Sequence, residues 1–372
     1  MKLYVKLITV ILATALVFPL TFISCGYSSN YETVMEYNGI KLTEEFYNYW
    51  LATYKRNILA SWPDAEDTDE FWNSRFDETR TVEEYYTEVI NKEIMNYLIS
   101  QDLYKKNTLK LPTSTKDSIK KDIDEKIEFY GGRGSLNSTL SDMMLNIDAL
   151  EQIYLWEAKH EYVYDYLFGQ NGPLEITDSD LLEYYEDNYY RIKYVVFYMT
   201  DIEVDADGNY VYDDSGELIS KPLSPEALEN KNNKINEFKA KLEGKTDFDT
   251  LIEDYSEYDT SSYPNGFFIS KNDVDIWGPE IFKAVVNGKE GDVVAVTEEE
   301  AIFYVQICKL TPFGQLDDAD VTQLTNLKFT EHATRKVYDE FYDDLASKVK
   351  INNKIMNKYM LSKIKANPHY SI

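Results

Sequence analysis

Residues 192–198 read IKYVVFY, a run of β-branched and aromatic side chains that predicts a β-strand. Upstream of it, residues 37–180 carry apolar side chains at helical spacing. Downstream, the pattern predicts helix, helix, strand, helix, strand and strand, at residues 225–242, 248–255, 267–269, 279–286, 293–296 and 302–307. This order predicts a compact α+β unit of about 120 residues.

The segments on both sides of this unit predict helices. Thr43 is followed by two acids, which is typical of a helix N-terminus. Residues 81–84 (TVEE) have the spacing of a capping box. Further helices are expected at residues 114–130 and 150–168 and, after Pro312, through residue 347. The predicted fold class is therefore α+β, with helical regions flanking the unit that contains the strands.

The composition narrows the classes of function. The chain has 38 Lys and Arg against 66 Asp and Glu, a formal charge of −28. Phosphate recognition needs a basic surface, so no nucleic-acid partner is expected. With three histidines and two cysteines the chain offers little for a metal centre, and we expect neither a metal nor a cofactor. Cys308 lies in a predicted strand, and we interpret it as a small core residue.

The N-terminus has the features of an export signal. Lys2 and Lys6 precede an apolar run at residues 7–22, which is short for a membrane-spanning helix. The run ends in FISCG, and a small residue before Cys25 followed by glycine is similar to a bacterial lipoprotein signal. We expect cleavage after Ser24 and lipidation of Cys25, which would anchor the chain at the outer face of the cell membrane. The alternative is an uncleaved N-terminal anchor, with the same extracytoplasmic location.

A turn-rich segment after the first strand predicts a hairpin and raises the question of calcium binding. Asp205, Asp207 and Asn209 match the first three ligand positions of an EF-hand loop. However, Tyr210 stands where that loop needs glycine, and Gly216 stands where it needs glutamate. We therefore expect a solvated hairpin at this place.

Five short motifs occur in an order that resembles a known family. They are KTDFDTLIEDYS (245–256), DTSS with NGFF (259–262 and 265–268), PEIFKA (279–284), GKEGDV (288–293) and YNGIKLT (37–43). The first four resemble a parvulin-type peptidyl-prolyl isomerase domain, and the last is similar to the start of extracytoplasmic foldases. The chain as a whole resembles the PrsA/SurA-like foldase lipoproteins of low-GC Gram-positive bacteria.

The resemblance implies a domain organisation. N- and C-terminal helices would form a chaperone domain, and the parvulin-like α+β domain would be inserted between them. The implied divisions are a signal peptide (1–24), an N-terminal helical chaperone domain (25–186), a parvulin-like domain (187–312) and C-terminal helices that complete the chaperone domain (313–372).

The resemblance also implies a site. Rotation about a prolyl bond needs an apolar slot for the ring and polar groups that stabilise the twisted amide, but no cofactor. The family places two histidines on neighbouring strands beside an acid, and here those two positions fall on Tyr194 and Phe303 while the acid falls on Asp259. Asp259 and Tyr194 are thus the candidate catalytic residues. The expected peptide-binding residues are Phe268, Trp277, Ile281 and Phe303.

Replacement of both histidines removes most of the family's polar network. The main hypothesis is a membrane-anchored extracytoplasmic protein-folding factor with a weak or inactive isomerase domain. Its partners would be unfolded or partly folded exported proteins and proline-containing segments. One alternative is an active peptidyl-prolyl cis-trans isomerase in which Tyr194 supplies a hydroxyl. Another is a surface solute- or glycan-binding lipoprotein that uses some of the 32 tyrosines as stacking platforms.

Overall fold

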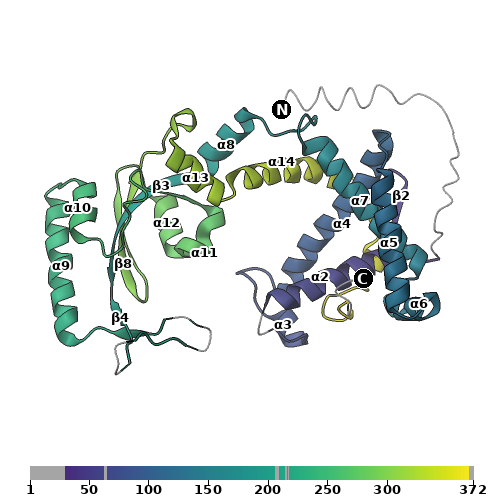
Figure 1. Cartoon of the computed structure of the whole chain (residues 1–372), viewed down its shortest axis with the longest axis horizontal. Coiled ribbons are helices and arrows are strands. Elements are labelled where there is room, and N and C mark those ends of the chain that lie inside the picture. The colour runs from purple at the N-terminus through teal and green to yellow at the C-terminus, as the bar shows by residue number, and fades with distance from the viewer. Residues whose placement is uncertain (1–29, 63–64, 206–208, 214–215, 217, 368–372) are drawn as a thin grey trace. The chain divides into compact units, whose positions relative to one another are not determined.

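The computed structural model describes residues 30–62, 65–205, 209–213, 216 and 218–367 (Figure 1). It contains both helices and sheets, which confirms the mixed class of fold predicted from the sequence. The described residues form two compact units. Unit 1 comprises the chain up to Pro173 together with the segment from Glu340, and unit 2 comprises Leu174–Asp339. The expected signal peptide and Cys25 lie outside the described residues.

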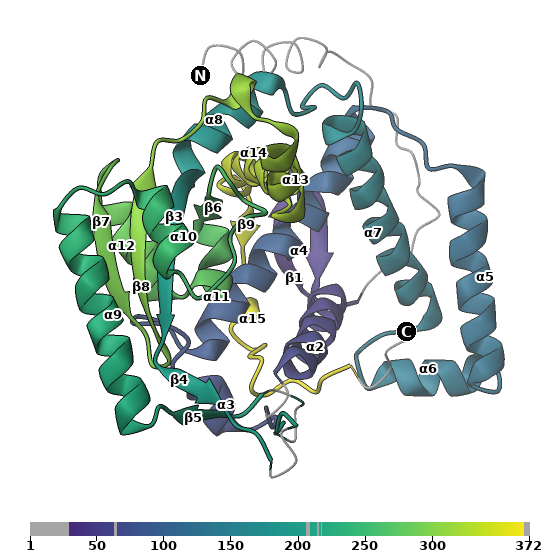
Figure 2. The same ribbon diagram turned by 60° about the vertical axis from the view of Figure 1, so that its left-hand side comes forward.

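The centre of unit 2 is an antiparallel sheet with strand order β6-β3-β8-β7 (Figure 2). Its strands are β3 (Tyr189–Tyr198), β6 (Phe267–Ser270), β7 (Val293–Thr297) and β8 (Ala301–Cys308). β3 pairs with β8 from Arg191, opposite Cys308, to Tyr198, opposite Ala301. β6 pairs only with residues 189–192 of β3, so the second half of β3 has an outer edge that β6 does not cover.

Helices cover both faces of this sheet. α9 (Pro225–Glu243) and α10 (Phe248–Tyr255) lie on one face, and α11 (Val274–Trp277) and α12 (Pro279–Asn287) lie on the other (Figure 1). The side chains of β3 alternate between the faces. Tyr194 contributes to the core beneath α12, whereas Val195 contributes to the core beneath α9 and α10. α9, α10, α12 and the four strands agree with the sequence-based predictions to within three residues at each end, whereas the short helix α11 was not predicted.

A third group of helices packs at β6: α8 (Asp178–Asn188), α13 (Asp318–Asn326) and the first part of α14 (Phe329–Ala346). A buried ion pair joins α13 to the sheet, because Arg191 Nη2 lies 2.7 Å from Asp320 Oδ1. The Arg191 guanidinium stacks 4.1 Å over the Phe268 ring and donates to the Asn265 carbonyl at 3.1 Å. Gln323 Oε1 accepts from the Phe268 N–H. α13 therefore fixes the start of β6.

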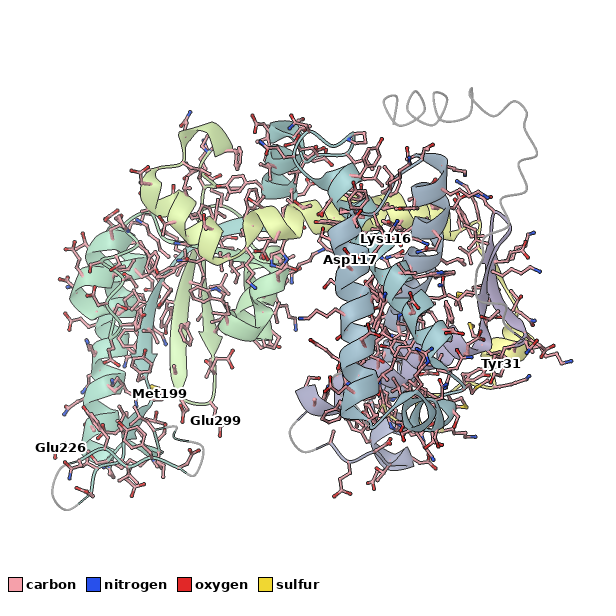
Figure 3. The ribbon with its side chains drawn as sticks, turned by 45° about the vertical axis from the view of Figure 1, so that its right-hand side comes forward. Tyr31, Lys116, Asp117, Met199, Glu226 and Glu299 are labelled. Carbon is pink, nitrogen blue, oxygen red and sulfur yellow. The ribbon has the colours of Figure 1, made fainter. Side chains whose placement is uncertain are left out.

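A small two-stranded sheet extends from the end of β3 and contains β4 (Thr200–Ile202) and β5 (Ser220–Pro222). The Met199 N–H donates to the Glu300 carbonyl at 2.6 Å, so Met199 and Glu299 lie at the same end of unit 2 (Figure 3). Asp205 closes a turn by accepting from the Asn209 N–H at 2.9 Å. Asp207, the other acid of the calcium hypothesis, lies outside the described residues.

Unit 1 contains a small sheet that the sequence analysis did not predict. Its strands are β1 (Thr33–Tyr37), β2 (Ile40–Thr43) and β9 (Lys350–Ile351), in the order β2-β1-β9. The β1–β2 turn places Asn38 at φ 50° and Gly39 at φ 81°, which is the left-handed pair that a tight hairpin needs. β9 comes from the C-terminal segment and pairs antiparallel with β1.

Most of the rest of unit 1 is helical: α2 (Glu44–Ser61), α3 (Asp69–Asn73), α4 (Val82–Lys106), α5 (Thr113–Phe129), α6 (Arg133–Ser141), α7 (Ile147–Phe168), the last residues of α14 from Glu340, and α15 (Asn353–Met356). The predicted capping box at the start of α4 is confirmed. Thr81 Oγ1 accepts from the Glu84 N–H at 3.2 Å, and Glu84 Oε2 accepts from the Thr81 N–H at 2.8 Å. α7 packs against α4 and α5 (Figure 2).

The C-terminal segment is tied into unit 1 by polar contacts. Lys55 is 1% exposed, and its ammonium contacts Asp67 at 2.6 Å and donates to the Ile364 carbonyl at 2.8 Å. The Ser362 N–H and hydroxyl both donate to the Glu83 carboxylate. The two ends of the described chain therefore build unit 1 together.

The unit boundaries differ from the expected domain boundaries. The sequence analysis divided the chain at 186/187 and 312/313, whereas the compact units divide at 173/174 and 339/340. The reason is that α8, α13 and the first part of α14 pack against β3 and β6. Within the described ranges, no helix has the length and apolar character needed to cross a membrane.

Candidate functional site

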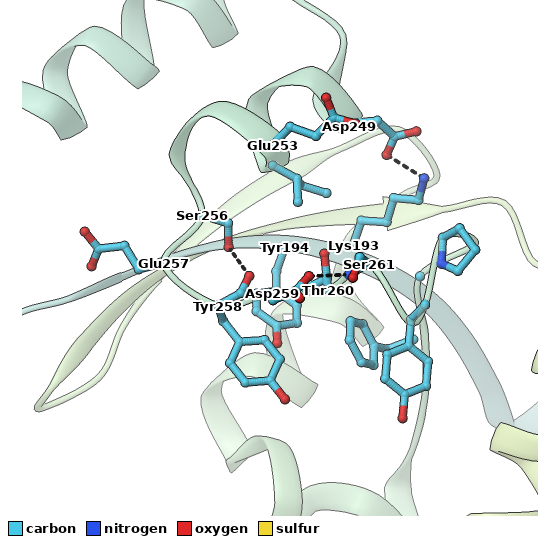
Figure 4. A pocket seen from close by; sticks show the side chains of 15 residues that line it. Lys193, Tyr194, Asp249, Glu253, Ser256, Glu257, Tyr258, Asp259, Thr260 and Ser261 are labelled. Carbon is cyan, nitrogen blue, oxygen red and sulfur yellow. Dashed lines mark hydrogen bonds and ion pairs between the residues drawn. The ribbon is translucent and has the colours of Figure 1, made fainter.

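A pocket of about 690 Å³ opens in unit 2 beside the part of β3 that β6 does not cover (Figure 4). Its walls are one side of α10 (Asp249, Ile252 and Glu253), the β3 residues Lys193 and Tyr194, the loop that follows α10, and Phe267 at the start of β6. The pocket therefore lies at an edge of the sheet.

The loop that closes this pocket is fixed at both ends. It leaves the sheet where the Glu257 N–H donates to the Val196 carbonyl at 3.0 Å. It rejoins the sheet at Gly266, whose φ of 89° is left-handed. A Cβ at Gly266 would lie 2.3 Å from the Ile192 carbonyl oxygen, so only glycine allows this approach.

Four of the residues predicted from the sequence lie together in the core between the sheet and α12. The Tyr194 ring is 5.7 Å from the Trp277 ring and 5.9 Å from the Phe303 ring, both in edge-to-face geometry. Ile281 is buried in the same cluster. Tyr194 also lines the pocket, so it joins the aromatic cluster to the pocket.

The structure does not bring Phe268, the fifth of the predicted aromatic and aliphatic residues, into this cluster. Its side chain lies on the opposite side of β6, where it packs with Tyr185, Tyr189 and Phe329 beneath the Arg191 guanidinium. The residue that faces the cluster is its neighbour Phe267, with its ring 5.4 Å from that of Tyr194. Adjacent residues of a strand point to opposite faces, so an error of one position moves the side chain across the sheet.

Asp259 lines the same pocket as Tyr194, on the exposed part of the loop. Its Oδ1 accepts from the Ser261 N–H at 2.8 Å. Hydrogen bonds from the Ser261 hydroxyl and N–H hold the pKa of Asp259 below its usual value. The carboxylate is consequently charged at neutral pH. Trp277, Ile281 and Phe303 lie behind Tyr194 in the core and do not line the pocket.

The pocket carries more negative than positive charge. Lys193 Nζ lies 2.5 Å from Asp249 Oδ1, and Lys231 Nζ lies 2.5 Å from Glu257 Oε1, so these acids are neutralised. Glu253 and Asp259 have no salt-bridge partner among the described residues. The electrostatics therefore favour a cationic group in the pocket.

Tyr194 is a buried residue that carries a hydroxyl group. The residue is 7% exposed, and no described residue is a hydrogen-bond partner of its hydroxyl. Burial, with a smaller contribution from the nearby hydroxyls of Tyr258 and Tyr198, raises the pKa of Tyr194. The phenol therefore stays protonated at neutral pH and can donate one hydrogen bond.

The pocket contains no strong nucleophile or imidazole base. None of its lining residues in the described part of the chain is histidine or cysteine. His160 lies in unit 1, with Nδ1 2.8 Å from Ser100 Oγ, and His332 lies on α14. Cys308 is half-buried on β8, and burial raises the pKa of its thiol. The described ranges show no cluster of His, Cys, Asp or Glu able to hold a metal ion. This arrangement can bind a ligand through an aromatic wall, one hydroxyl donor and two carboxylates.

Sequence reasoning missed three aromatic side chains of the site. Tyr258 and Tyr263 line the pocket from the loop, and Phe267 lines it from β6. The Tyr258 ring stacks 6.4 Å from that of Tyr194, and the Tyr263 ring lies 4.5 Å from that of Phe267. The tyrosines alternate with polar residues in a loop, a pattern that carries no periodic signal.

Comparisons with known proteins give weak likenesses. No protein-family model matches the chain, and no curated protein matches it. The chain is similar to PrsA from Bacillus subtilis at 16% identity and a TM-score of 0.23, over 77% of this chain and 93% of that one. It is similar to the foldase protein PrsA from Streptococcus pneumoniae at 12% identity and a TM-score of 0.23, over 89% and 100% of the two chains. At such TM-scores these likenesses establish neither the site nor the function.

Proposed function

We propose that the chain is an extracytoplasmic protein-folding factor that binds unfolded exported polypeptides in the pocket beside β3. The supporting observation is the position of Tyr194, which belongs both to the aromatic cluster and to the pocket wall. Exposed chain segments of an unfolded protein present aromatic, aliphatic and cationic side chains. An aromatic wall next to carboxylates without salt-bridge partners can bind all three kinds of side chain.

Catalysis of prolyl isomerisation is weak or absent in this proposal. The two family histidine positions carry Tyr194 and Phe303, whose rings pack against each other in the core. One neutral hydroxyl and the loop carboxylate of Asp259 are the polar groups that remain at the implied positions. Removing a preorganised donor from a catalytic site costs about 100- to 1,000-fold in rate, so the loss of two predicts a rate near the uncatalysed one.

Peptide binding is tested with Tyr258→Ala. Tyr258 is 49% exposed and lines the pocket, so its removal leaves the core intact. We expect the variant to bind a fluorescent unfolded peptide about fivefold more weakly and to suppress client aggregation less well. Tyr166→Ala is the matched control, because Tyr166 is 41% exposed on α7 and lies in unit 1. Equal affinities for the two variants, or tight binding of a sugar without any suppression of aggregation, would reject the proposal.

The alternative of an active isomerase is tested in a protease-coupled assay with a proline-containing peptide. We expect the uncatalysed rate for the natural chain. A faster rate that Tyr194→Phe removes would show that the Tyr194 hydroxyl supports catalysis. That result would replace the proposal of a weak or inactive domain.

We further propose that Cys25 is lipidated and anchors the chain at the outer side of the cell membrane. The support is the sequence pattern FISCG at residues 22–26. In cells fed a radioactive fatty acid, the natural chain is expected to be labelled and retained with membranes, while Cys25→Ala is not labelled. Release of an unlabelled natural chain into the medium would contradict this assignment.

A further inference from the structure

The outer edge of β3 has a gap in its backbone pairing. In an antiparallel ladder the N–H and C=O groups of alternate residues point to the same side. Ile192 pairs with Phe267 of β6, and the Val196 carbonyl accepts from the Glu257 N–H. Tyr194 lies between them, so its N–H and C=O point to the same edge, and no described residue pairs with them there.

The pocket occupies this gap. The loop leaves the strand after Glu257 and returns at Gly266, and the space between loop and strand is the pocket of about 690 Å³. Tyr194 lines this pocket, and its backbone N–H, backbone C=O and side-chain hydroxyl have no hydrogen-bond partner among the described residues. An unpaired strand edge is a template for the backbone of another extended segment.

The charges around the gap indicate which kind of polypeptide segment can bind there. Glu253 and Asp259 lack cationic partners among the described residues and line the same pocket. The chain itself carries a formal charge of −28, so a second copy would be repelled. A basic segment of another polypeptide is complementary to the pocket.

We propose that an extended basic polypeptide segment docks at this gap, pairing the backbone of one of its residues with the N–H and C=O of Tyr194. A neighbouring lysine or arginine of the segment lies beside Asp259 and Glu253, and its apolar side chains contact Phe267 and Tyr258. This inference rests on the proposed function and specifies how the polypeptide is held: through its main chain, so that many sequences can bind.

The main-chain contact is tested with a fluorescent, unstructured peptide of alternating lysine and valine and the full chain. A matched peptide carries N-methyl groups on alternate backbone nitrogens, which removes the donors on one edge but keeps every side chain. We expect about tenfold weaker binding of the edge-methylated peptide, because a lost hydrogen bond also leaves a carbonyl without its partner. In hydrogen exchange, the Tyr194 amide is expected to become protected when the unmodified peptide is added.

The charge contact is tested with the double variant Glu253→Gln and Asp259→Asn, which keeps the size of both side chains and the acceptor for the Ser261 N–H. We expect about fivefold weaker binding of the lysine peptide at low salt, and little change at high salt. Glu290→Gln, an exposed acid in the turn before β7, is the control and should bind like the natural chain.

The outcomes separate this inference from the proposed function. If the natural chain binds both peptides equally and the Tyr194 amide is not protected, the docking mode is wrong while polypeptide binding stands. If neither peptide binds and client aggregation is not suppressed, both the docking mode and the proposed function are wrong.

Discussion

Glu157 on α7 is a carboxyl group in an aromatic environment. It accepts from Trp50 Nε1 at 2.8 Å, and the Trp50 ring stacks on that of Tyr97 at 4.8 Å. Burial raises the pKa of Glu157 to about 7, an effect that the bond from Trp50 opposes and the nearby Glu161 carboxylate reinforces. The folded protein therefore holds a proton here that the unfolded chain releases near its ordinary pKa of 4.5.

Because the folded protein binds this proton more tightly than the unfolded chain does, we expect the stability of the protein to fall as the pH rises. The folded state binds more protons than the unfolded state between about pH 4.5 and pH 7, so the free energy of unfolding falls across that window. Glu157→Gln keeps the bond from Trp50 and removes the titration. As the pH rises from 4.5 to 8, we expect the free energy of unfolding of this variant to increase by about 3 kcal/mol relative to that of the natural chain. Urea unfolding of unit 1 measures this difference. A constant difference across that range would show that Glu157 ionises normally in the fold.

Gly266 and Gly291 form a matched pair for testing how the loop meets the sheet. Both have left-handed φ values, 89° and 90°, but only at Gly266 would a Cβ meet the Ile192 carbonyl oxygen, at 2.3 Å. Gly291→Ala is expected to lower the free energy of unfolding by about 1–2 kcal/mol, from the strain of the left-handed backbone conformation alone. Gly266→Ala is expected to lose at least about 2 kcal/mol more, because the loop must move, and to weaken peptide binding. Equal losses in thermal unfolding would mean that the loop can shift without cost.

At the scale of elements, one buried ion pair joins α13 to β3, next to the hydrogen bond that links α13 to β6. Arg191 and Asp320 have side chains that are 2% and 4% exposed. Asp320→Ala leaves the guanidinium buried without its partner, and we expect a loss of about 3–5 kcal/mol in the stability of unit 2 by urea unfolding. Replacing both residues, as Arg191→Met with Asp320→Leu, should restore most of that loss. A single variant as stable as the natural chain would show that the pair does not hold α13 in place.

The order of the elements in unit 2 could be predicted from the sequence, but the register of β6 could not. The helices at 248–255 and 279–287 have strong periodic patterns and turn residues at their ends, so their limits were nearly correct. In β6, Phe267 and Phe268 are equally apolar, and period-two alternation alone does not say which one faces Tyr194. The Arg191 guanidinium, which stacks on the Phe268 ring, and Gln323, which accepts from the Phe268 N–H, fix the register, and Gln323 is 55 residues away in the sequence.

In unit 1 the missed hairpin had a local signal, whereas its third strand had none. Asn38-Gly39 between two apolar segments is a strong signal for a tight hairpin turn. The stripe of helical spacing that begins at Phe46 masked it. β9 has two residues and becomes a strand only by pairing with β1, at a separation of more than 300 residues. No local pattern can predict such a contact.

At the scale of the molecule, unit 1 is expected to depend on its C-terminal segment while unit 2 does not. A chain that ends at Ser347 loses β9 and the bonds of Ile364 and Ser362 to Lys55 and Glu83. Three such bonds at about 1 kcal/mol each predict a loss of at least about 3 kcal/mol in unit 1. Hydrogen exchange followed peptide by peptide should show faster exchange in α2 and α4 and unchanged exchange in β3 and β8. Faster exchange in both units would mean that they unfold as one.

The two-part construction of unit 1 sets an order of folding during synthesis. Unit 2 is a continuous segment and can fold as soon as residue 339 has emerged. Unit 1 can be completed only after the chain from residue 340 has emerged, because that segment is part of the unit. The ion pair between Lys358 and Glu32, for example, joins residues that are 326 positions apart. Once unit 2 has folded, the connection between the two parts of unit 1 is far shorter than 326 flexible residues, which lowers the entropic cost of joining them. If unit 2 folds first, it brings the two parts of unit 1 close together, and unit 1 can then assemble last.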